Sequence, residues 1–145
     1  MSTRILRTKP DARKKPRQAR SQATGDALVE AAARVLAKEG WLGFTTNKVA
    51  ALAGVSIGSL YQYYPDKTAL LEAVRERHLN DCLKAVERSA SCLERPEAFA
   101  QSIVHELIEV HRKNPRLHKV LIDEAPISAA LADPHSRFEQ TYLGL

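Results

Sequence analysis

Two histidines and an acidic residue raise the question of metal-dependent hydrolysis. His105-Glu106 followed by His111 comes close to the H-E-x-x-H pattern of zinc hydrolases, but Glu109 stands where the second histidine would be needed. Six residues turn a helix by about 600°, so His105 and His111 would lie on different faces, unsuited to one metal ion. The sequence has no G-x-S-x-G elbow, phosphate-binding glycine loop or paired thiols. We therefore expect no enzyme, no catalytic residue, no metal and no cofactor.

Small and hydroxyl-bearing residues of a different kind gather between residues 45 and 67. Ser56 can cap a helix and can also offer its hydroxyl to a phosphate group. Gly58 and Ser59 follow at once, at the start of that helix, and would let its backbone approach DNA closely. These residues are suited to contact with a duplex rather than to covalent chemistry.

Two short helices are expected to position these groups. Thr45 or Thr46 can cap the first helix, and Gly54 ends it by adopting a left-handed backbone at no Cβ cost. Ser56 caps the second helix, which ends at Pro65 because the residue before a proline disfavours helical geometry. This pattern behind a longer first helix indicates a helix-turn-helix. A tight helical hairpin with no such role is the alternative.

The rest of the chain also has helical periodicity. A first helix from Ser21 carries apolar residues at i, i+3, i+4 and i+7 and ends at Gly40. Large apolar residues after Gly40 are expected to anchor the helix pair: Trp41, Leu42 and Phe44. Later helices are expected to start near capping residues and prolines: Asp66, Pro96, Asn114-Pro115 and Asp133-Pro134. No alternating β-type stretch competes, so the predicted fold class is all-α.

The net charge of +5 is unevenly distributed along the 145 residues. Residues 1–20 carry +7, whereas the other 125 residues carry −2. Such a basic arm on a nearly neutral body suggests a polyanionic partner, and its two prolines and few apolar residues predict disorder when it is free. The alternative is a solvated tail with no partner.

The cysteines and the apolar runs of the sequence indicate in which cellular compartment the protein is expected. The two cysteines, Cys82 and Cys92, form no C-x-x-C pair and suit a reducing, cytoplasmic setting. The N-terminal residues hold no apolar stretch of signal-peptide length, and no run reaches the ~20 apolar residues of a membrane span. We expect a cytoplasmic protein that does not bind membranes.

Residues 45–71 resemble the DNA-binding domain of TetR-type (tetracycline-repressor-like) transcriptional regulators. They read TTNKVA at 45–50, GVSIGSLYQYY at 54–64 and PDKTALL at 65–71, and the match extends from about Ser21 to Val74. The resemblance implies a three-helix DNA-binding domain with a helix-turn-helix, followed by part of a helical regulatory domain. It divides the chain into a basic disordered arm (1–20), a DNA-binding domain (21–68) and an incomplete regulatory or effector domain (69–145).

The resemblance also assigns roles to residues. The second short helix would enter the major groove, with Ile57 and Ser59 facing bases, Tyr61 touching phosphate or a thymine methyl, and Lys67 pairing with phosphate. Tyr63 stands where the family more often has histidine, and its hydroxyl can still bond a phosphate. The DNA-binding residues expected together are Thr45, Thr46, Asn47, Lys48, Ser56, Ile57, Gly58, Ser59, Tyr61, Gln62, Tyr63 and Lys67. Phosphate contacts from the arm are expected at Arg17 and Arg20.

The base-facing side chains discriminate weakly between base pairs. Ile57 can meet only a thymine methyl, and Ser59 can bond several bases. Only Asn47 or Gln62 offers an amide for two-point reading of a base, so specificity is expected to rest on Gln62, apolar contacts and DNA shape. Tyr64 is expected in the core.

Family members use the later helices to bind a small effector and to dimerise. The effector-pocket candidates are Phe99, Ile103, Leu107, His111, Leu121 and Tyr142, although ordinary packing explains each of them too. The resemblance implies a repressor of a palindromic double-stranded operator, released by a small molecule. This chain stops before the two helices that usually form the dimer. Either it is a truncated product or fragment, or a homodimer would use another surface.

Two other classes of function stay open. A helical interaction module could bind RNA or anionic lipid through its basic arm, and its binding would be salt-sensitive but independent of sequence. A DNA-binding fragment without effector response is the other alternative. Loss of duplex binding in Tyr61→Ala or Lys67→Ala would favour the regulator.

Overall fold

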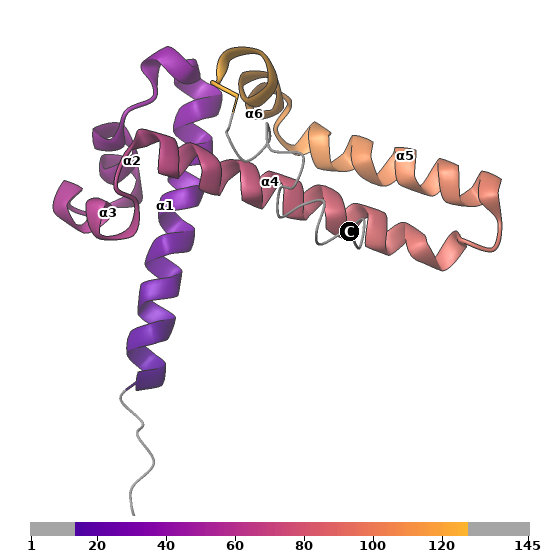
Figure 1. The fold of residues 1–145 in the computed structure, drawn as a ribbon, viewed down its shortest axis with the longest axis horizontal. Helices are drawn as coiled ribbons and strands as arrows, with labels where there is room; N and C mark the ends of the chain where they lie inside the picture. Colours follow the sequence, from indigo (N-terminus) through magenta and orange to yellow (C-terminus); the bar gives the residue numbers. More distant parts are fainter. Residues whose placement is uncertain (1–13, 128–145) are drawn as a thin grey trace, which may run out of the picture.

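The computed structural model describes residues 14–127, and the fold there is helical without strands. Figure 1 shows a long first helix crossed by α4, with two short helices on one side and a helical arm on the other. The elements in chain order are α1 (Lys14–Gly43), α2 (Thr46–Ala53), α3 (Ile57–Tyr63), α4 (Lys67–Ser89), the short 3₁₀ turn η1 (Ala90–Cys92), α5 (Pro96–Lys113), α6 (Pro115–Lys119) and the π-helical turn η2 (Val120–Glu124). The predicted all-α class is confirmed. None of the described helices has the length and apolarity of a membrane-crossing segment.

The first helix begins earlier than the sequence predicted. α1 starts at Lys14, so residues 14–20, expected as part of a disordered arm, are helical. Pro16 lies in the first turn, where a helix has no use for the backbone N–H that proline lacks. The residues that follow it up to Thr24 include no glycine or proline, so nothing interrupts the helix there. Residues 1–13 lie outside the described part.

Gly40 ends the regular part of α1, as predicted. Its φ of 68° and ψ of 179° are not helical, and the chain kinks there before Trp41. The kink turns Phe44 into the core, where it is fully buried, and leaves Trp41 partly buried. Leu42, predicted as a third anchor, is instead 96% exposed, because the kink changes which residues of this short segment face inward.

One hydrophobic core joins the helix pair to the later helices. Its buried members come from α1, α2, α3 and α4, together with Leu117 of α6 and Val120 and Leu121 of η2. The predicted boundary between residues 68 and 69 therefore falls inside α4 and inside this shared core. The DNA-binding domain and α6 are consequently packed as one unit.

Beyond this core, α4 and α5 run side by side as a helical arm (Figure 1). Ala85 and Ser89 of α4 are buried there, and Ser102 of α5 donates to Ser89 at 3.0 Å between their hydroxyl oxygens. Val86 is 40% exposed, although an apolar residue at helical spacing would be expected to face inward, because Ala85 takes the inward position on this part of α4. The helix predicted after Asp133-Pro134 lies outside the described residues.

Candidate nucleic-acid interface

The turn between α2 and α3 is built by the capping residues that the sequence predicted. Thr45 caps α2 by accepting from the backbone N–H of Lys48, and Ser56 caps α3 by accepting from that of Ser59 at 3.1 Å. Gly54 adopts the left-handed conformation with φ 71° and ψ 29°. A Cβ on Gly54 would meet nothing within 4 Å, so glycine is needed there for its backbone and not for space. The helix-turn-helix prediction is confirmed.

α3 buries one side and exposes the other. Leu60 is fully buried in the core, and Tyr63 and Tyr64 pack against that core. Ile57 is 36% exposed and Tyr61 is 49% exposed, and Gly58 and Gln62 are exposed as well. The exposed side therefore carries four of the predicted contacts, and Tyr64 takes the core position expected of it.

Two hydroxyl groups from different helices meet at this surface. The Thr46 Oγ1 of α2 lies 3.1 Å from the Tyr61 hydroxyl oxygen of α3. Within α3's first turn, the Ser56 and Ser59 hydroxyl oxygens are 2.8 Å apart. Each pair holds more hydrogen-bonding capacity than its mutual bond uses, because a hydroxyl donates once and accepts twice.

The helical start of α1 is attached to the C-terminal end of α3. The Tyr63 hydroxyl donates to Ser21 Oγ at 3.3 Å, and the ring of Tyr63 lies 3.7 Å from where a Cβ on Gly25 would be. Arg20 is exposed and precedes Ser21 directly. The backbone of the predicted phosphate-contact segment is thus fixed next to α3. The side chain of Arg17 lies outside the described part. Ser21 itself was not predicted, since only the folded chain brings it to Tyr63.

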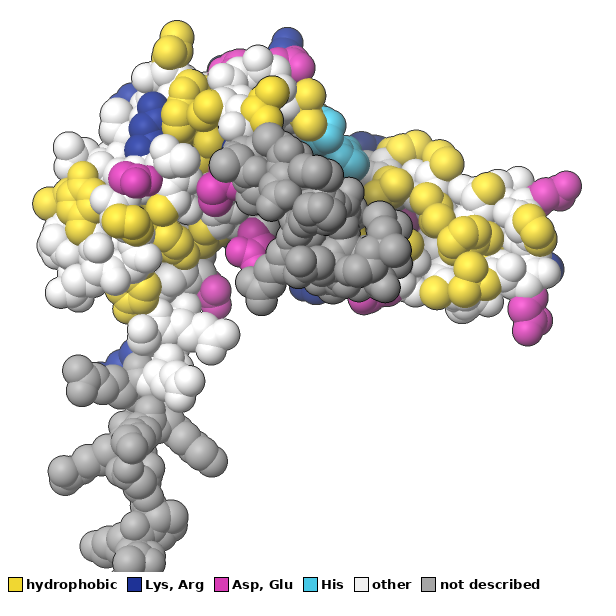
Figure 2. Space-filling view, viewed as in Figure 1, with side chains coloured by type: hydrophobic (Ala, Val, Ile, Leu, Met, Phe, Trp, Pro, Cys, Tyr) yellow, Lys and Arg dark blue, Asp and Glu magenta, His cyan; other side chains and the backbone are white. Residues whose placement is uncertain are grey.

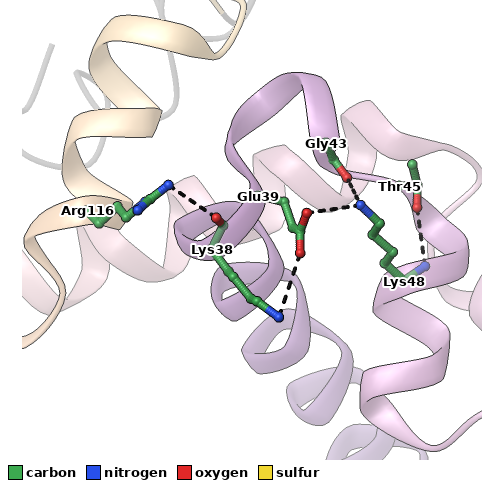
Figure 3. A network of polar contacts seen from close by, with 6 residues as sticks. All are labelled: Lys38, Glu39, Gly43, Thr45, Lys48 and Arg116. Carbon is green, nitrogen blue, oxygen red and sulfur yellow. Dashed lines mark hydrogen bonds and ion pairs between the residues drawn. The ribbon is translucent and has the colours of Figure 1, made fainter.

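The Lys48 ammonium makes its contacts within the protein, although its side chain is 48% exposed (Figure 3). Its Nζ donates to the Gly43 carbonyl at 3.0 Å and pairs with Glu39 Oε2 at 3.2 Å. In the same network Arg116 of α6 donates to the Lys38 carbonyl of α1 at 3.2 Å. The predicted phosphate contact of Lys48 would therefore have to compete with Glu39.

Lys67, at the start of α4, is similarly engaged. Its Nζ donates to the Trp41 carbonyl at 3.1 Å and lies 3.8 Å from the centre of the Trp41 ring. A lysine ammonium has three N–H donors, so this contact leaves some of them available. Lys67 thus joins the α1–α2 corner to α4 and sits where a phosphate contact was predicted.

The predicted effector-pocket residues lie on α5 and η2. Phe99, Ile103, Leu107 and His111 are half-buried on α5, the helix that packs against α4, whereas Leu121 is buried in the shared core. Tyr142 lies outside the described residues. Leu121 thus belongs to the shared core, whereas Phe99, Ile103 and Leu107 lie outside it on α5.

Comparison with known proteins identifies the helix-turn-helix unit. Residues 28–74 match the family model described as "Bacterial regulatory proteins, tetR family". This range spans most of α1, all of α2 and α3, and the first part of α4.

Several curated relatives share the same name, nucleoid occlusion factor SlmA. The chain is 32% identical to the protein from Glaesserella parasuis over 88 residues, which is 61% of this chain and 43% of that one. It is 34% identical to the Haemophilus ducreyi protein over 89 residues, or 61% and 44% of the two chains. With the Pasteurella multocida protein it shares 28% identity over 107 residues, or 70% and 54%. The chain spans about half the length of the curated relatives it matches.

Proposed function

We propose that this chain, whose residues 28–74 match the model of the tetR family of bacterial regulatory proteins, binds a specific DNA duplex with α3 in the major groove. The observation that carries this proposal is the exposed side of α3, where Ile57, Gly58, Tyr61 and Gln62 stand beside the Thr46–Tyr61 hydroxyl pair. A major groove about 12 Å wide accepts a helix.

Base reading would come from the exposed side chains of α3. The Gln62 amide can bond adenine at two points, and Ile57 can contact a thymine methyl. The Ser59 hydroxyl makes one hydrogen bond, with Ser56, and a hydroxyl can donate one and accept two. Ser59 could therefore also bond a base. With so few direct contacts, the sequence-dependent shape of the duplex would add to the selection.

Phosphate contacts would flank the groove on both sides. On one side the Thr46 and Tyr61 hydroxyls, 3.1 Å apart, are placed to bond one phosphate together. On the other side α1 carries Arg17 and Arg20 shortly before Ser21, the residue whose hydroxyl accepts from Tyr63. A helical segment positions these cations at lower entropic cost than a disordered arm.

Regulation is the finer part of the proposal. A duplex-bound protein would repress by excluding polymerase, and a small apolar effector binding among Phe99, Ile103, Leu107, His111 and the C-terminal part of the chain would release it. Two copies would read the halves of a palindrome about 34 Å apart. Val104 and Ile108 of α5 are 57% and 50% exposed, which offers an apolar surface for pairing. The mass in solution with and without operator DNA measures that step.

A second candidate function comes from the names of the relatives. Proteins named nucleoid occlusion factor align with 61% to 70% of this chain. The same DNA contacts could then serve nucleoid occlusion instead of transcription. A deletion strain separates the two: altered transcripts beside the bound sites favour the regulator, and altered nucleoid occlusion with unchanged transcripts favours the second candidate.

Selection of bound duplexes from a random pool tests the DNA-binding proposal. We expect enrichment of one motif, and a palindromic motif would support pairing of two copies. Retention of RNA or anionic vesicles with no enriched duplex would instead favour the basic-arm interaction module. The variant Tyr61→Ala, taken through the same selection, should lose the motif while keeping its helical circular dichroism.

A further inference from the structure

Three histidines far apart in sequence converge where α4, α5 and α6 meet. His78 comes from α4, His111 from the end of α5 and His118 from α6. One ring nitrogen of each lies within 4.8 Å of the other two, and all three side chains are half-buried. Figure 2 shows histidine side chains, in cyan, gathered near the start of the helical arm. The cluster lies away from the exposed face of α3.

One of the three nitrogen–nitrogen distances matches that of a transition-metal site, and the other two are within 4.8 Å. His118 Nδ1 and His78 Nε2 are 3.3 Å apart. Tetrahedral zinc with Zn–N bonds of about 2.0–2.1 Å holds its ligand nitrogens roughly 3.3 Å apart. His111 meets each of the other two rings edge to face, with interplanar angles of 84° and 85°, whereas the rings of His78 and His118 are tilted by 51°.

A hydrogen bond to the backbone shows which ring nitrogen of His111 carries the proton. His111 Nδ1 lies 2.6 Å from the Leu107 carbonyl oxygen, which can only accept, so Nδ1 carries the proton. Its Nε2 then holds the free lone pair. A histidine ligand in proteins usually donates its other ring N–H to such a carbonyl, which fixes the ring for coordination.

The surroundings of two of the rings disfavour their charged form and also include carboxylates. Burial lowers the pKa of His78 and of His118, and neighbouring histidines lower both further. Asp81 acts on His78 and Asp123 on His118 in the opposite direction, so both carboxylates are close enough to favour a dication.

We propose that His78 Nε2, His111 Nε2 and His118 Nδ1 bind one zinc-class divalent cation, with the fourth position open to water or an exogenous ligand. Imidazole nitrogens select Zn²⁺, Ni²⁺ or Cu²⁺ over Mg²⁺ and Ca²⁺, which prefer oxygen. On binding, the hydrogen now shared by His78 and His118 moves to the other nitrogen of its own ring, so no net proton is lost from two neutral rings.

The site would join α4, α5 and α6 at one point, in addition to the hydrogen bond and ion pair that already link α4 to α5. α6 and η2 also contact α1, where Arg116 bonds the Lys38 carbonyl and Glu124 Oε2 accepts from the Trp41 N–H at 3.3 Å. A bound ion would therefore fix α5 and α6 against α4 and stabilise the folded chain. This inference is independent of the proposed DNA binding.

Titration of the tag-free chain with Zn²⁺ against a chromophoric chelator tests the site directly. We expect one Zn²⁺ per chain, no competition by millimolar Mg²⁺, and a rise in melting temperature of roughly 5–10 °C at saturation. His111→Gln should weaken binding at least about 100-fold, since loss of even an outer partner costs 10–100-fold. The matched control is His105→Gln, an exposed histidine on the same helix.

Measurements on the metal-free protein show whether the His111→Gln variant folds, so that a loss of Zn²⁺ binding is not mistaken for a loss of folding. Circular dichroism of His111→Gln without metal should equal that of the wild type, and Co²⁺ should give the absorption of a tetrahedral nitrogen site only where His111 is present. The proposal is overturned if Zn²⁺ binds without 1:1 saturation, if His105→Gln weakens it equally, or if folded His111→Gln binds as the wild type does.

Discussion

The hydroxyl groups of Thr46 and Tyr61 lie 3.1 Å apart, although they come from different helices of the helix-turn-helix. Tyr61 is half exposed, so the pair is open to an outside ligand. This contact fixes where α2 and α3 present their hydroxyls, and we propose that one phosphate of the duplex binds there.

Tyr61→Phe should weaken duplex binding roughly 10- to 100-fold, because a hydrogen bond to a charged group contributes about 1.5–3 kcal/mol. The free energy of unfolding should change by less than about 1 kcal/mol, since the pair is exposed. Fluorescence anisotropy with a labelled duplex measures the affinity. Tyr64→Phe, the same change in a tyrosine packed against the core, should bind like the wild type. Equal affinities for wild type and Tyr61→Phe would show that the Tyr61 hydroxyl does not bind a phosphate.

Gly58→Ala separates contact with DNA from folding. A Cβ there would approach only Ser56 Oγ at 4.0 Å, and Gly58 has no positive φ, so the folded chain should tolerate it. Alanine should leave stability unchanged or raise it by up to about 1 kcal/mol. Its methyl group would nevertheless obstruct the close approach of α3 to the duplex, and affinity should fall about tenfold or more.

Gly54→Ala is the comparison for Gly58→Ala, because it should lower stability instead of leaving it unchanged. At φ 71° an alanine is strained, so we expect a loss of about 1–2 kcal/mol in unfolding free energy. Urea unfolding of both glycine variants checks the pair. If Gly58→Ala is destabilised but still binds DNA, Gly58 is needed for folding and not for contact with the duplex, which would contradict this account.

Lys67→Met tests the contact between α4 and the α1–α2 corner. Removing the ammonium loses its bond to the Trp41 carbonyl and its position 3.8 Å from the ring, and should cost about 1–2 kcal/mol of stability. Trp41 is the sole tryptophan of the chain, so its fluorescence reports urea unfolding at this position. Lys38→Met, at a lysine whose side chain is 82% exposed, is the control and should have little effect.

The same variant decides whether Lys67 also contacts phosphate. If it does, the slope of log affinity against log salt should fall in magnitude by about 0.9. An unchanged slope together with lower stability would mean that Lys67 acts only within the protein.

Arg17→Gln combined with Arg20→Gln should lower the salt slope by about 1.8 and weaken binding to specific and scrambled duplexes alike. The reason is that these residues would contact phosphates and no base. Arg95→Gln, at the exposed N-terminal end of α5, is the matched control. A change confined to the specific duplex would instead indicate base contact, and no change would exclude the start of α1 from the interface.

Local signals in the sequence were enough to predict the helix-turn-helix. Thr45, Gly54 and Ser56 act through neighbours within four residues, and all three lie as predicted. The start of α1 was missed because composition indicated disorder, while a proline in a first turn permits a helix. The exposure of Leu42 depends on the kink at Gly40, which the apolar pattern does not reveal.

Long-range contacts account for most of what the sequence did not predict. Lys48 with Glu39, Lys67 with Trp41 and Tyr63 with Ser21 each depend on how helices cross. The histidine cluster is the extreme case, since His111 was considered as a metal ligand only together with His105 on its own helix. Its neighbours, His78 and His118, come from two other helices, and no spacing pattern relates them.

The central claim is that α3 reads a DNA sequence, and competition between duplexes tests it most directly. A labelled duplex of the selected motif is bound at fixed salt and displaced by unlabelled copies of the motif or of a scrambled duplex with the same composition. The account predicts that the motif competes about 10³-fold better, and that Tyr61→Ala loses most of this ratio. Equal competition by the two duplexes would contradict sequence reading by α3 and leave only charge-driven binding.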